Sequence, residues 1–218
     1  YFFRIKMEKG LMQTGTTTLA ILCKDGVVLA ADRRMTAGTM IVSKKFQKII
    51  PLNDDIALTI AGMVSDAQLL TKIIKAQLRL DSIRRNKKSS VKEAANLIGS
   101  LTYNNIRKFT PFLSVVGFLL GGRDESGYHI YDIGVDGSVS EHDDYVCDGS
   151  GSTFSVGLLE ANYNKDISVD DGVKLAVKAL NSSIQRDMPT GNGFDVFTVT
   201  DKGVKKVLSR KLDTQIAL

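Results

Sequence analysis

Three consecutive threonines near the start of the chain are the residues whose types and spacing best suit chemistry. They follow Gly15 and open an apolar run at residues 19–23. A threonine at a new N-terminus carries its own base, because an α-amino group has a pKa of about 7.7–8.0 and can take the hydroxyl proton. We therefore hypothesise that the chain cuts its own Gly15–Thr16 bond and that Thr16 becomes a nucleophile. A β-turn glycine before a Thr-rich strand explains the same residues, since threonine favours strands.

A nucleophile of this kind needs a nearby cation, which keeps the amine neutral and polarises the threonine oxygen, and a carboxylate that holds the cation. Asp32 stands at the charged end of an apolar strand-like run, and Lys48 opens another such run. A lysine that opens a buried strand is usually a strand-end charge whose ammonium group reaches solvent. Spacing alone leaves both interpretations open.

Other kinds of site find weaker support. His129 and His142 are the only histidines, and both lie in charged strand-turn segments that suit surface positions. The group Gly149-Ser150-Gly151 lacks the spacing of a nucleophile elbow. It also lacks the Gly-Lys-Ser or Gly-Lys-Thr ending of a phosphate-binding loop, so a tight strand-to-helix turn is favoured. A glycoside-hydrolase pair of carboxylates stays open, but nothing singles out two of the 24 acidic residues.

Composition predicts one globular, soluble domain. The 218 residues are 43% hydrophobic and 24% charged, and the net charge is +5. Lysines and arginines are scattered without a basic, aromatic-lined stripe, which argues against a nucleic-acid partner. Cys23, Cys147 and the two histidines show no zinc spacing, so reduced thiols and no metal are expected. No run reaches the ~18 apolar residues of a membrane span. Residues 1–7 are too short and too charged for a secretory signal, so we expect a cytoplasmic protein.

The first half of the chain passes from β-type to helical patterns. A hairpin is predicted with strands at 17–24 and 27–31, followed by a short strand at 39–42 and a strand pair at 48–52 and 56–61. Apolar residues at helical spacing then predict helices over 66–85 and 90–108. Ser90 and Glu93 have the spacing of a capping box at the start of the second helix.

The second half repeats this order. Strands are predicted at 113–120, where Thr110-Pro111 restarts β structure, at 128–133 and at 138–146. Helices follow at 153–162 and, capped by Ser168, at 169–185; a hairpin at 194–200 and 204–208 ends the pattern. We expect an α+β fold, a four-layer αββα sandwich of two antiparallel sheets flanked by helix pairs.

From Thr14 onward the chain resembles the proteasome β-subunit family, specifically its archaeal type. The matching motifs occur in the family's order: Thr14-Gly15-Thr16-Thr17-Thr18, Ala31-Asp32-Arg33-Arg34, Lys48 before an apolar strand, Ala61-Gly62 leading to Asp66-Ala67-Gln68, Gly149-Ser150-Gly151-Ser152 and Gln185-Arg186-Asp187. The resemblance implies an N-terminal-nucleophile hydrolase that acts as a threonine endopeptidase without a cofactor. It also implies a leader at residues 1–15, removed on maturation, and a single domain at 16–218.

The resemblance implies a role for each matching residue. Thr16 is expected to be the nucleophile after self-cleavage, Lys48 the cation that lowers its proton affinity, and Asp32 the carboxylate that orients Lys48. The backbone N–H of Gly62 is expected to hold the oxyanion. Gly15 is expected to allow a tight, strained turn that presents its carbonyl to the Thr16 hydroxyl.

Three further side chains are implied to surround the threonine amine. Ser150 and Asp187 are expected to support it, and Thr190 stands where the family often has a serine, with an added methyl group that affects fine positioning. The pocket for the residue before the cut is expected to be apolar, which predicts cleavage after hydrophobic residues. Its expected lining is Met35, Phe46, Ile50, Ile60 and Val64.

The implied partners are proteasome α subunits, other β subunits in heptameric rings, an ATPase regulator and unfolded polypeptide substrates. One alternative is a structural ring subunit that assembles but never matures, or an assembly intermediate that still carries the leader. Another is an N-terminal-nucleophile amidohydrolase acting on small amides. The long helical stretch from residue 66 to residue 108 suits packing in a ring and argues against that last alternative.

Overall fold

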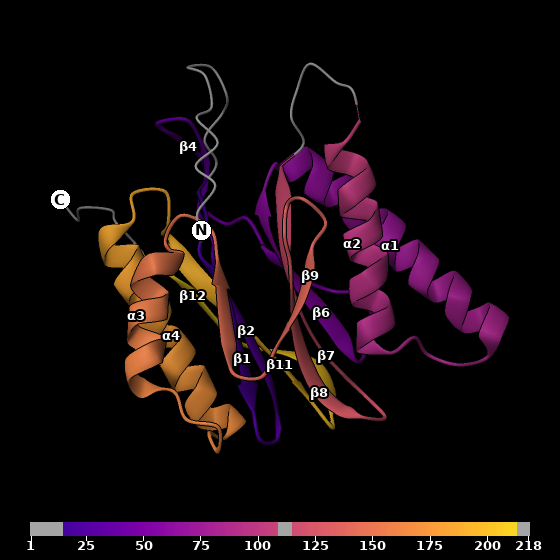
Figure 1. The fold of residues 1–218 in the computed structure, drawn as a ribbon. Coiled ribbons are helices and arrows are strands. Elements are labelled where there is room, and N and C mark those ends of the chain that lie inside the picture. Colours follow the sequence, from indigo (N-terminus) through magenta and orange to yellow (C-terminus); the bar gives the residue numbers. More distant parts are fainter. Residues whose placement is uncertain (1–14, 109–114, 213–218) are drawn as a thin grey trace.

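The computed structural model describes residues 15–108 and 115–212, and in these ranges two antiparallel sheets are stacked between two pairs of helices (Figure 1). Each of the two stacked sheets has five strands. The predicted α+β sandwich of the αββα type is confirmed. The expected leader at residues 1–15 lies, except for Gly15, outside the described residues, as does Thr110-Pro111.

The first sheet carries the segment that begins at Gly15. Its strand order is β10-β1-β2-β11-β12. The strands are β1 (Thr18–Cys23), β2 (Gly26–Asp32), β10 (Tyr145–Asp148), β11 (Gly193–Thr200) and β12 (Gly203–Lys211). Both predicted hairpins, β1–β2 and β11–β12, are present, and β2 pairs with β11 in the middle of the sheet. This pairing places the end of β2 beside the start of β11.

The second sheet lies against the first and has the order β5-β6-β7-β8-β9. Its strands are β5 (Ile49–Pro51), β6 (Ile56–Gly62), β7 (Val116–Asp124), β8 (Gly127–Ile133) and β9 (Val139–His142). The two sheets approach closely at Gly121, where an added Cβ atom would lie 2.8 Å from the Val27 side chain.

The single strand predicted over residues 138–146 is wrong. Strand β9 pairs with β8 in the second sheet, whereas β10 pairs with β1 in the first sheet. Asp143 and Asp144 bend the chain between them, and the backbone N–H of Leu22 donates to the Asp144 carbonyl at 2.8 Å. A run of strand-forming residues on both sides of two acids appears continuous in the sequence, although the chain crosses from one sheet to the other there.

A small additional sheet was only half predicted. The strands β3 (Met35–Ala37) and β4 (Met40–Ser43) form a two-stranded hairpin, whereas only residues 39–42 were expected to be a strand. Gly38 lies at the turn with a φ of +59°, a conformation that glycine adopts without steric cost.

Each pair of helices covers the outer face of one sheet. Helices α1 (Val64–Arg85) and α2 (Val91–Ile106) pack on the second sheet, and α3 (Ser152–Asn162) and α4 (Val169–Arg186) pack on the first (Figure 1). The predicted capping box is formed, because Ser90 Oγ accepts from the Glu93 N–H and Glu93 Oε2 accepts from the Ser90 N–H. None of these described helices is long and apolar enough to cross a membrane.

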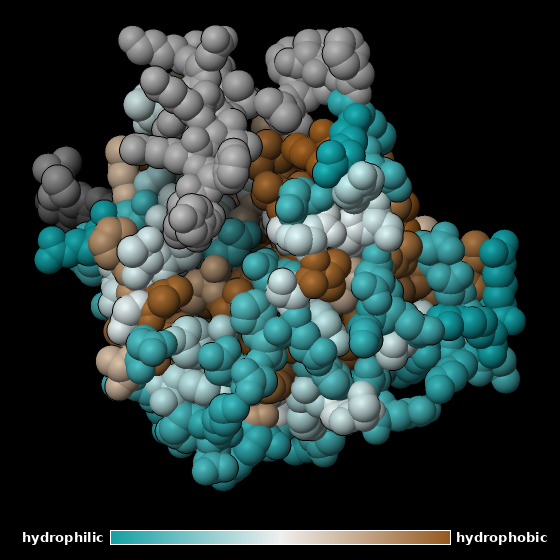
Figure 2. Space-filling view, in the orientation of Figure 1, coloured by the Kyte–Doolittle hydropathy of each residue, from teal (hydrophilic) through white to brown (hydrophobic). Residues whose placement is uncertain are grey.

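The apolar residues are buried in three layers. One layer lies under α1 and α2, one under α3 and α4, and the third between the two sheets. Figure 2 shows hydrophilic residues over much of the lower part of the visible face and over the outer end of the α1–α2 pair. The sandwich thus supplies a rigid, buried frame, and the residues predicted for catalysis lie at its edge.

Candidate active site

Thr16 lies two residues before the start of β1 and is buried, with 6% of its surface exposed. Its hydroxyl donates a hydrogen bond of 2.7 Å to the carbonyl oxygen of Gly15. Its own carbonyl accepts from the Gly151 N–H at 3.3 Å. The Thr16 hydroxyl therefore contacts the Gly15 carbonyl group, which is the group that it would attack in self-cleavage.

A buried ion pair lies beside this peptide bond. Lys48 Nζ is 2.6 Å from Asp32 Oδ1, and both side chains are almost completely shielded from solvent. The same carboxylate accepts from three backbone N–H groups, those of Thr17, Arg34 and Gly191, at 2.9–3.1 Å. Four donors thus surround the Asp32 carboxylate and fix its position.

The Lys48 side chain itself points at the peptide bond between Gly15 and Thr16. Its Nζ lies 3.5 Å from the carbonyl oxygen of Gly15. Burial lowers the pKa of the Lys48 ammonium group, and Asp32 and, more weakly, Asp187 oppose this shift. Because water is excluded around Lys48, its positively charged ammonium group acts strongly on nearby oxygen atoms. The arrangement can polarise a carbonyl or stabilise a developing negative charge.

A second set of hydrogen bonds connects the Thr16 nitrogen to Asp187. The Thr16 N–H donates to Ser150 Oγ at 3.3 Å, and Ser150 Oγ donates to Asp187 Oδ2 at 2.7 Å. Thr190 donates to the same carboxylate oxygen at 2.5 Å. Since the Thr190 proton is used there, the 2.7 Å contact between the Thr17 and Thr190 hydroxyls has Thr17 as its donor. These side chains therefore orient the nitrogen that self-cleavage would convert into an amine.

The glycine-rich segment is the predicted turn from a strand into a helix. It joins β10 to α3, and Gly149 has a φ of +98°. An added Cβ atom on Gly149 would lie 2.1 Å from the Thr16 carbonyl oxygen, and one on Gly151 would lie 2.1 Å from Thr17 Oγ1. The turn needs glycine because it passes so close to the threonines.

A small cavity of about 20 Å³ adjoins Thr16 and Lys48, which leaves room for about one water molecule. Gly62 lines it at the end of β6, with a φ of +118°, and a Cβ atom there would lie 2.1 Å from the Val115 carbonyl oxygen. Ile50 is placed elsewhere, against the core under α1 and α2. Four of the five expected pocket residues line the cavity: Met35, Phe46, Ile60 and Val64.

Gly15 faces Pro189 so closely that a side chain does not fit there. An added Cβ atom would lie 1.8 Å from Pro189 Cβ and 2.5 Å from Pro189 Cγ. The strained turn expected at Gly15 also involves Thr14, which lies outside the described residues. The glycine is required here because another segment of the chain occupies the space of a side chain.

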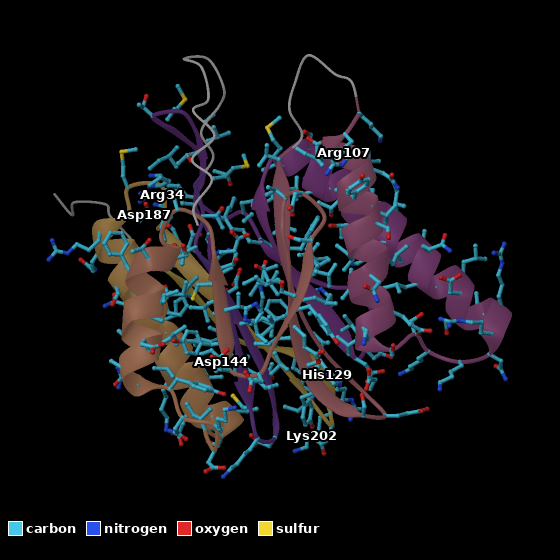
Figure 3. All side chains as sticks on the ribbon, in the orientation of Figure 1. Arg34, Arg107, His129, Asp144, Asp187 and Lys202 are labelled. Carbon is cyan, nitrogen blue, oxygen red and sulfur yellow. The ribbon has the colours of Figure 1, made fainter. Side chains whose placement is uncertain are left out.

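Sequence reasoning missed three residues of this site. Pro189 covers Gly15, Thr36 Oγ1 accepts from the Gly15 N–H at 3.2 Å, and Arg34 donates to the Met188 carbonyl at 2.5 Å. Figure 3 shows Arg34 and Asp187 close together at one end of the sandwich. The position of Pro189 between Asp187 and Thr190, and that of Arg34 and Thr36 just after Asp32, were the available signals.

Two acids near the glycine turn have raised pKa values. The Asp148 carboxylate on β10 lies against β7 of the other sheet, because a Cβ atom added to Gly117 would be 2.8 Å from Asp148 Oδ2. Burial raises the pKa of Asp148. Burial, and then the charge of Asp148, raise the pKa of Asp132 on β8 to about 6. Asp136 adds to this shift, while His142 on β9 opposes it. The folded chain therefore favours the protonated form of Asp132.

Replacing Asp132 by Asn is expected to stabilise the chain at neutral pH. Folding raises the Asp132 pKa from its usual value near 4 to about 6, so its contribution to stability is fully present below about pH 4 and is lost as the pH rises through about 6. In thermal unfolding of the purified chain, the melting temperature of Asp132→Asn should increasingly exceed that of the parent between pH 4.5 and 7. The control Asp143→Asn should show no such gain, because its Lys165 partner lowers the pKa of Asp143. A constant difference across this range would contradict the assignment.

The histidines do not form an alternative active site. Ser126 Oγ lies 2.9 Å from His129 Nε2, and His129 Nδ1 lies 2.8 Å from Glu141 Oε1, which is the order of a serine–histidine–acid triad. However, the Ser126 hydroxyl and N–H both donate to Asp124 Oδ1, at 2.5 and 2.8 Å. The serine proton is thus committed to the β7–β8 turn. In residues 15–108 and 115–212, no group of three or more His, Cys, Asp or Glu side chains is placed to hold a metal ion.

Comparisons with known proteins cover the whole of this site. A family model described as "Proteasome subunit" matches residues 12–199. The chain is 45% identical over 188 residues to a "Proteasome subunit beta" of Ferroglobus placidus, covering 86% of this chain and 88% of the relative. It is 41% identical over 199 residues to one of Archaeoglobus profundus, covering 91% of both. With one of Nanoarchaeum equitans the identity is 43% over 193 residues, 88% of this chain and 96% of the relative.

Proposed function

Because the chain belongs to the proteasome family, as a β-type peptidase subunit of the core particle, we propose that it is a threonine-type endopeptidase with Thr16 as nucleophile. One observation carries this proposal. The Thr16 hydroxyl lies 2.7 Å from the Gly15 carbonyl oxygen, and the buried Lys48 ammonium group lies 3.5 Å from that same oxygen. A nucleophile, a carbonyl and a cation thus meet at one peptide bond.

Self-cleavage would create the active enzyme. Thr16 Oγ1 attacks the Gly15 carbonyl carbon, the bond from that carbon to the Thr16 nitrogen breaks, and the hydroxyl proton ends on the nitrogen. The product is an ester between Gly15 and Thr16 Oγ1, which a water molecule hydrolyses. Residues 1–15 leave as the leader, and the domain at 16–218 begins with a free threonine amine.

In later turnovers the free amine is the base. It takes the Thr16 hydroxyl proton, with Ser150 and Asp187 holding it in place, while Lys48 stabilises the negative charge on the threonine oxygen. The oxygen attacks a substrate carbonyl, and the Gly62 N–H stabilises the oxyanion in a position that only glycine can adopt. The amine returns its proton to the leaving nitrogen, and water then hydrolyses the acyl-enzyme ester.

The proposal includes the setting in which this chain works. It assembles with α subunits and with other β subunits in seven-membered rings, in a cytoplasmic particle that receives unfolded polypeptides from an ATPase regulator. The deciding experiment is intact-mass analysis of the chain after assembly with its α subunits. A new terminus at Thr16 supports the active peptidase, whereas an intact leader in the finished particle would support a structural subunit that does not mature.

Peptides with a hydrophobic residue before the cut should be the best substrates. The four pocket side chains are apolar, and among the described residues no Asp or Glu lines the cavity to pair with a basic residue. We expect kcat/KM to be about tenfold or more higher for Leu, Phe or Tyr before a fluorogenic leaving group than for Arg, because an arginine would be desolvated without a partner. Met35→Ala should reduce this preference, and Ile50→Val, outside the cavity, should leave it unchanged. Faster turnover of the arginine peptide would disprove the assignment of the pocket.

A further inference from the structure

Gly15 is held by contacts on every side of its backbone. Its N–H donates to Thr36 Oγ1 at 3.2 Å. Its carbonyl oxygen accepts from Thr16 Oγ1 and lies 3.5 Å from Lys48 Nζ. Its Cα faces Pro189, so closely that an added Cβ atom would lie 1.8 Å from Pro189 Cβ. These contacts fix the orientation of the carbonyl group that Thr16 would attack.

The contact with Pro189 excludes every other residue type at this position. An added Cβ atom would overlap the Cβ and Cγ atoms of Pro189, at 1.8 and 2.5 Å. Both atoms belong to the proline ring and are not the far end of a flexible side chain. Pro189 therefore makes glycine a requirement of packing at residue 15.

Pro189 is firmly placed. The Thr190 hydroxyl and backbone N–H donate to the Asp187 carboxylate and carbonyl at 2.5 and 3.1 Å, which closes the loop on both sides of the proline. Arg34, in the short connection between β2 and β3, donates to the Met188 carbonyl at 2.5 Å. The proline ring itself restricts φ. Pro189 therefore cannot readily move away to make space for a side chain at residue 15.

Thr36 fixes the opposite edge of Gly15. It lies on β3 and is 6% exposed, and its hydroxyl oxygen accepts a hydrogen bond from the Gly15 N–H. That bond fixes the direction of the Gly15 N–H group. With the N–H and Cα both fixed, the carbonyl has little freedom to turn away from Thr16 Oγ1.

We propose that Pro189 and Thr36 form a clamp that selects glycine at residue 15 and positions it for self-cleavage. The clamp contacts a residue that is present only before the Gly15–Thr16 bond is cut. Both are positioning residues, and their effect falls mainly on leader removal, while later peptide hydrolysis depends less on them. This inference rests on the proposed self-cleavage at Thr16.

The glycine requirement is tested by relieving the clash. Gly15→Ala should slow leader removal about tenfold to a hundredfold, because the new methyl group overlaps Pro189. Adding Pro189→Gly removes both ring atoms in the clash and should restore the rate about tenfold. Adding Pro189→Ala is the matched control, since alanine also lacks the ring but keeps the Cβ atom 1.8 Å from the added methyl group. It should not restore the rate. The readout is a time course of intact mass after assembly with α subunits, and equal rates for the two double variants would overturn the proposal.

The Thr36 hydroxyl is tested separately, so the clamp stays testable if a Pro189 variant does not assemble. Thr36→Val should slow leader removal about tenfold, the effect of one lost hydrogen bond, and Thr36→Ser should restore the parent rate. The same variants are then made in a chain whose leader is replaced by a removable fusion that exposes Thr16. Their kcat/KM for peptides should fall much less than the rate of leader removal. An equal fall in both would make Thr36 a general substrate-binding residue and would overturn the clamp.

Failure of the clamp can be separated from failure of the proposed function. If a Thr16→Ala precursor still loses its leader at the Gly15–Thr16 bond, self-cleavage itself is wrong. If the parent chain cuts there in a Thr16-dependent way but the Pro189 and Thr36 variants process at the parent rate, only the clamp is wrong.

Discussion

Replacing Thr16 by Ala is expected to reduce the rates of leader removal and of peptide hydrolysis, each by at least about a thousandfold. The expected loss is this large because the hydroxyl that lies 2.7 Å from the Gly15 carbonyl oxygen is the only nucleophile that the proposal assigns. Leader removal is followed by intact mass in the assembled particle, and hydrolysis by the release of a fluorogenic peptide group.

Two neighbouring substitutions make this result specific. Thr16→Ser keeps the hydroxyl and should retain both activities at a reduced rate. Thr18→Val removes a buried hydroxyl that has no hydrogen-bond partner in the part of the chain that the structure describes, and it should process and hydrolyse like the parent. Hydrolysis that survives in Thr16→Ala would disprove the mechanism, and loss in Thr18→Val would show that the threonine run matters for folding instead.

Replacing Lys48 by Met should reduce hydrolysis by about a hundredfold to a thousandfold, the effect of removing a positioned charge from a buried site. Methionine has a similar length, so the cavity beside Thr16 stays filled. The variant leaves Asp32 buried without its ion-pair partner at 2.6 Å, and breaking a buried pair in this way costs about 3–5 kcal/mol of stability. Peptide hydrolysis and chemical denaturation are measured on the same preparation.

The double variant Asp32→Asn with Lys48→Met separates the two effects. A neutral amide replaces the buried unpaired charge, but its NH2 group faces a backbone N–H donor in either orientation. Only part of the lost stability should therefore return, while the activity stays low. Recovery of activity together with stability would show that the ion pair only supports the fold. An unchanged activity in Lys48→Met alone would remove the cation from the mechanism.

The helices and most strands could be predicted because their signals are local. The capping box of Ser90 and Glu93, the helical spacing through α1 and α2, and the hairpin at β1–β2 depend on residues close together in the chain. The crossing between β9 and β10 could not be predicted, because one run of strand-forming residues is compatible with one sheet or two. Which sheet each half joins depends on partners elsewhere in the chain.

The candidate site likewise combines features that the sequence shows with features that only the folded chain shows. The motifs around Thr16, Asp32, Lys48, Ser150 and Asp187 point to the chemistry and to the family, since residue types and their order are properties of the chain itself. Folding alone brings these side chains from five separate segments to one peptide bond. It also supplies a reason for Gly15 that no local pattern shows: the space of a side chain is taken by Pro189 from the far end of the sequence. Contacts of this kind follow from packing, which no local pattern encodes.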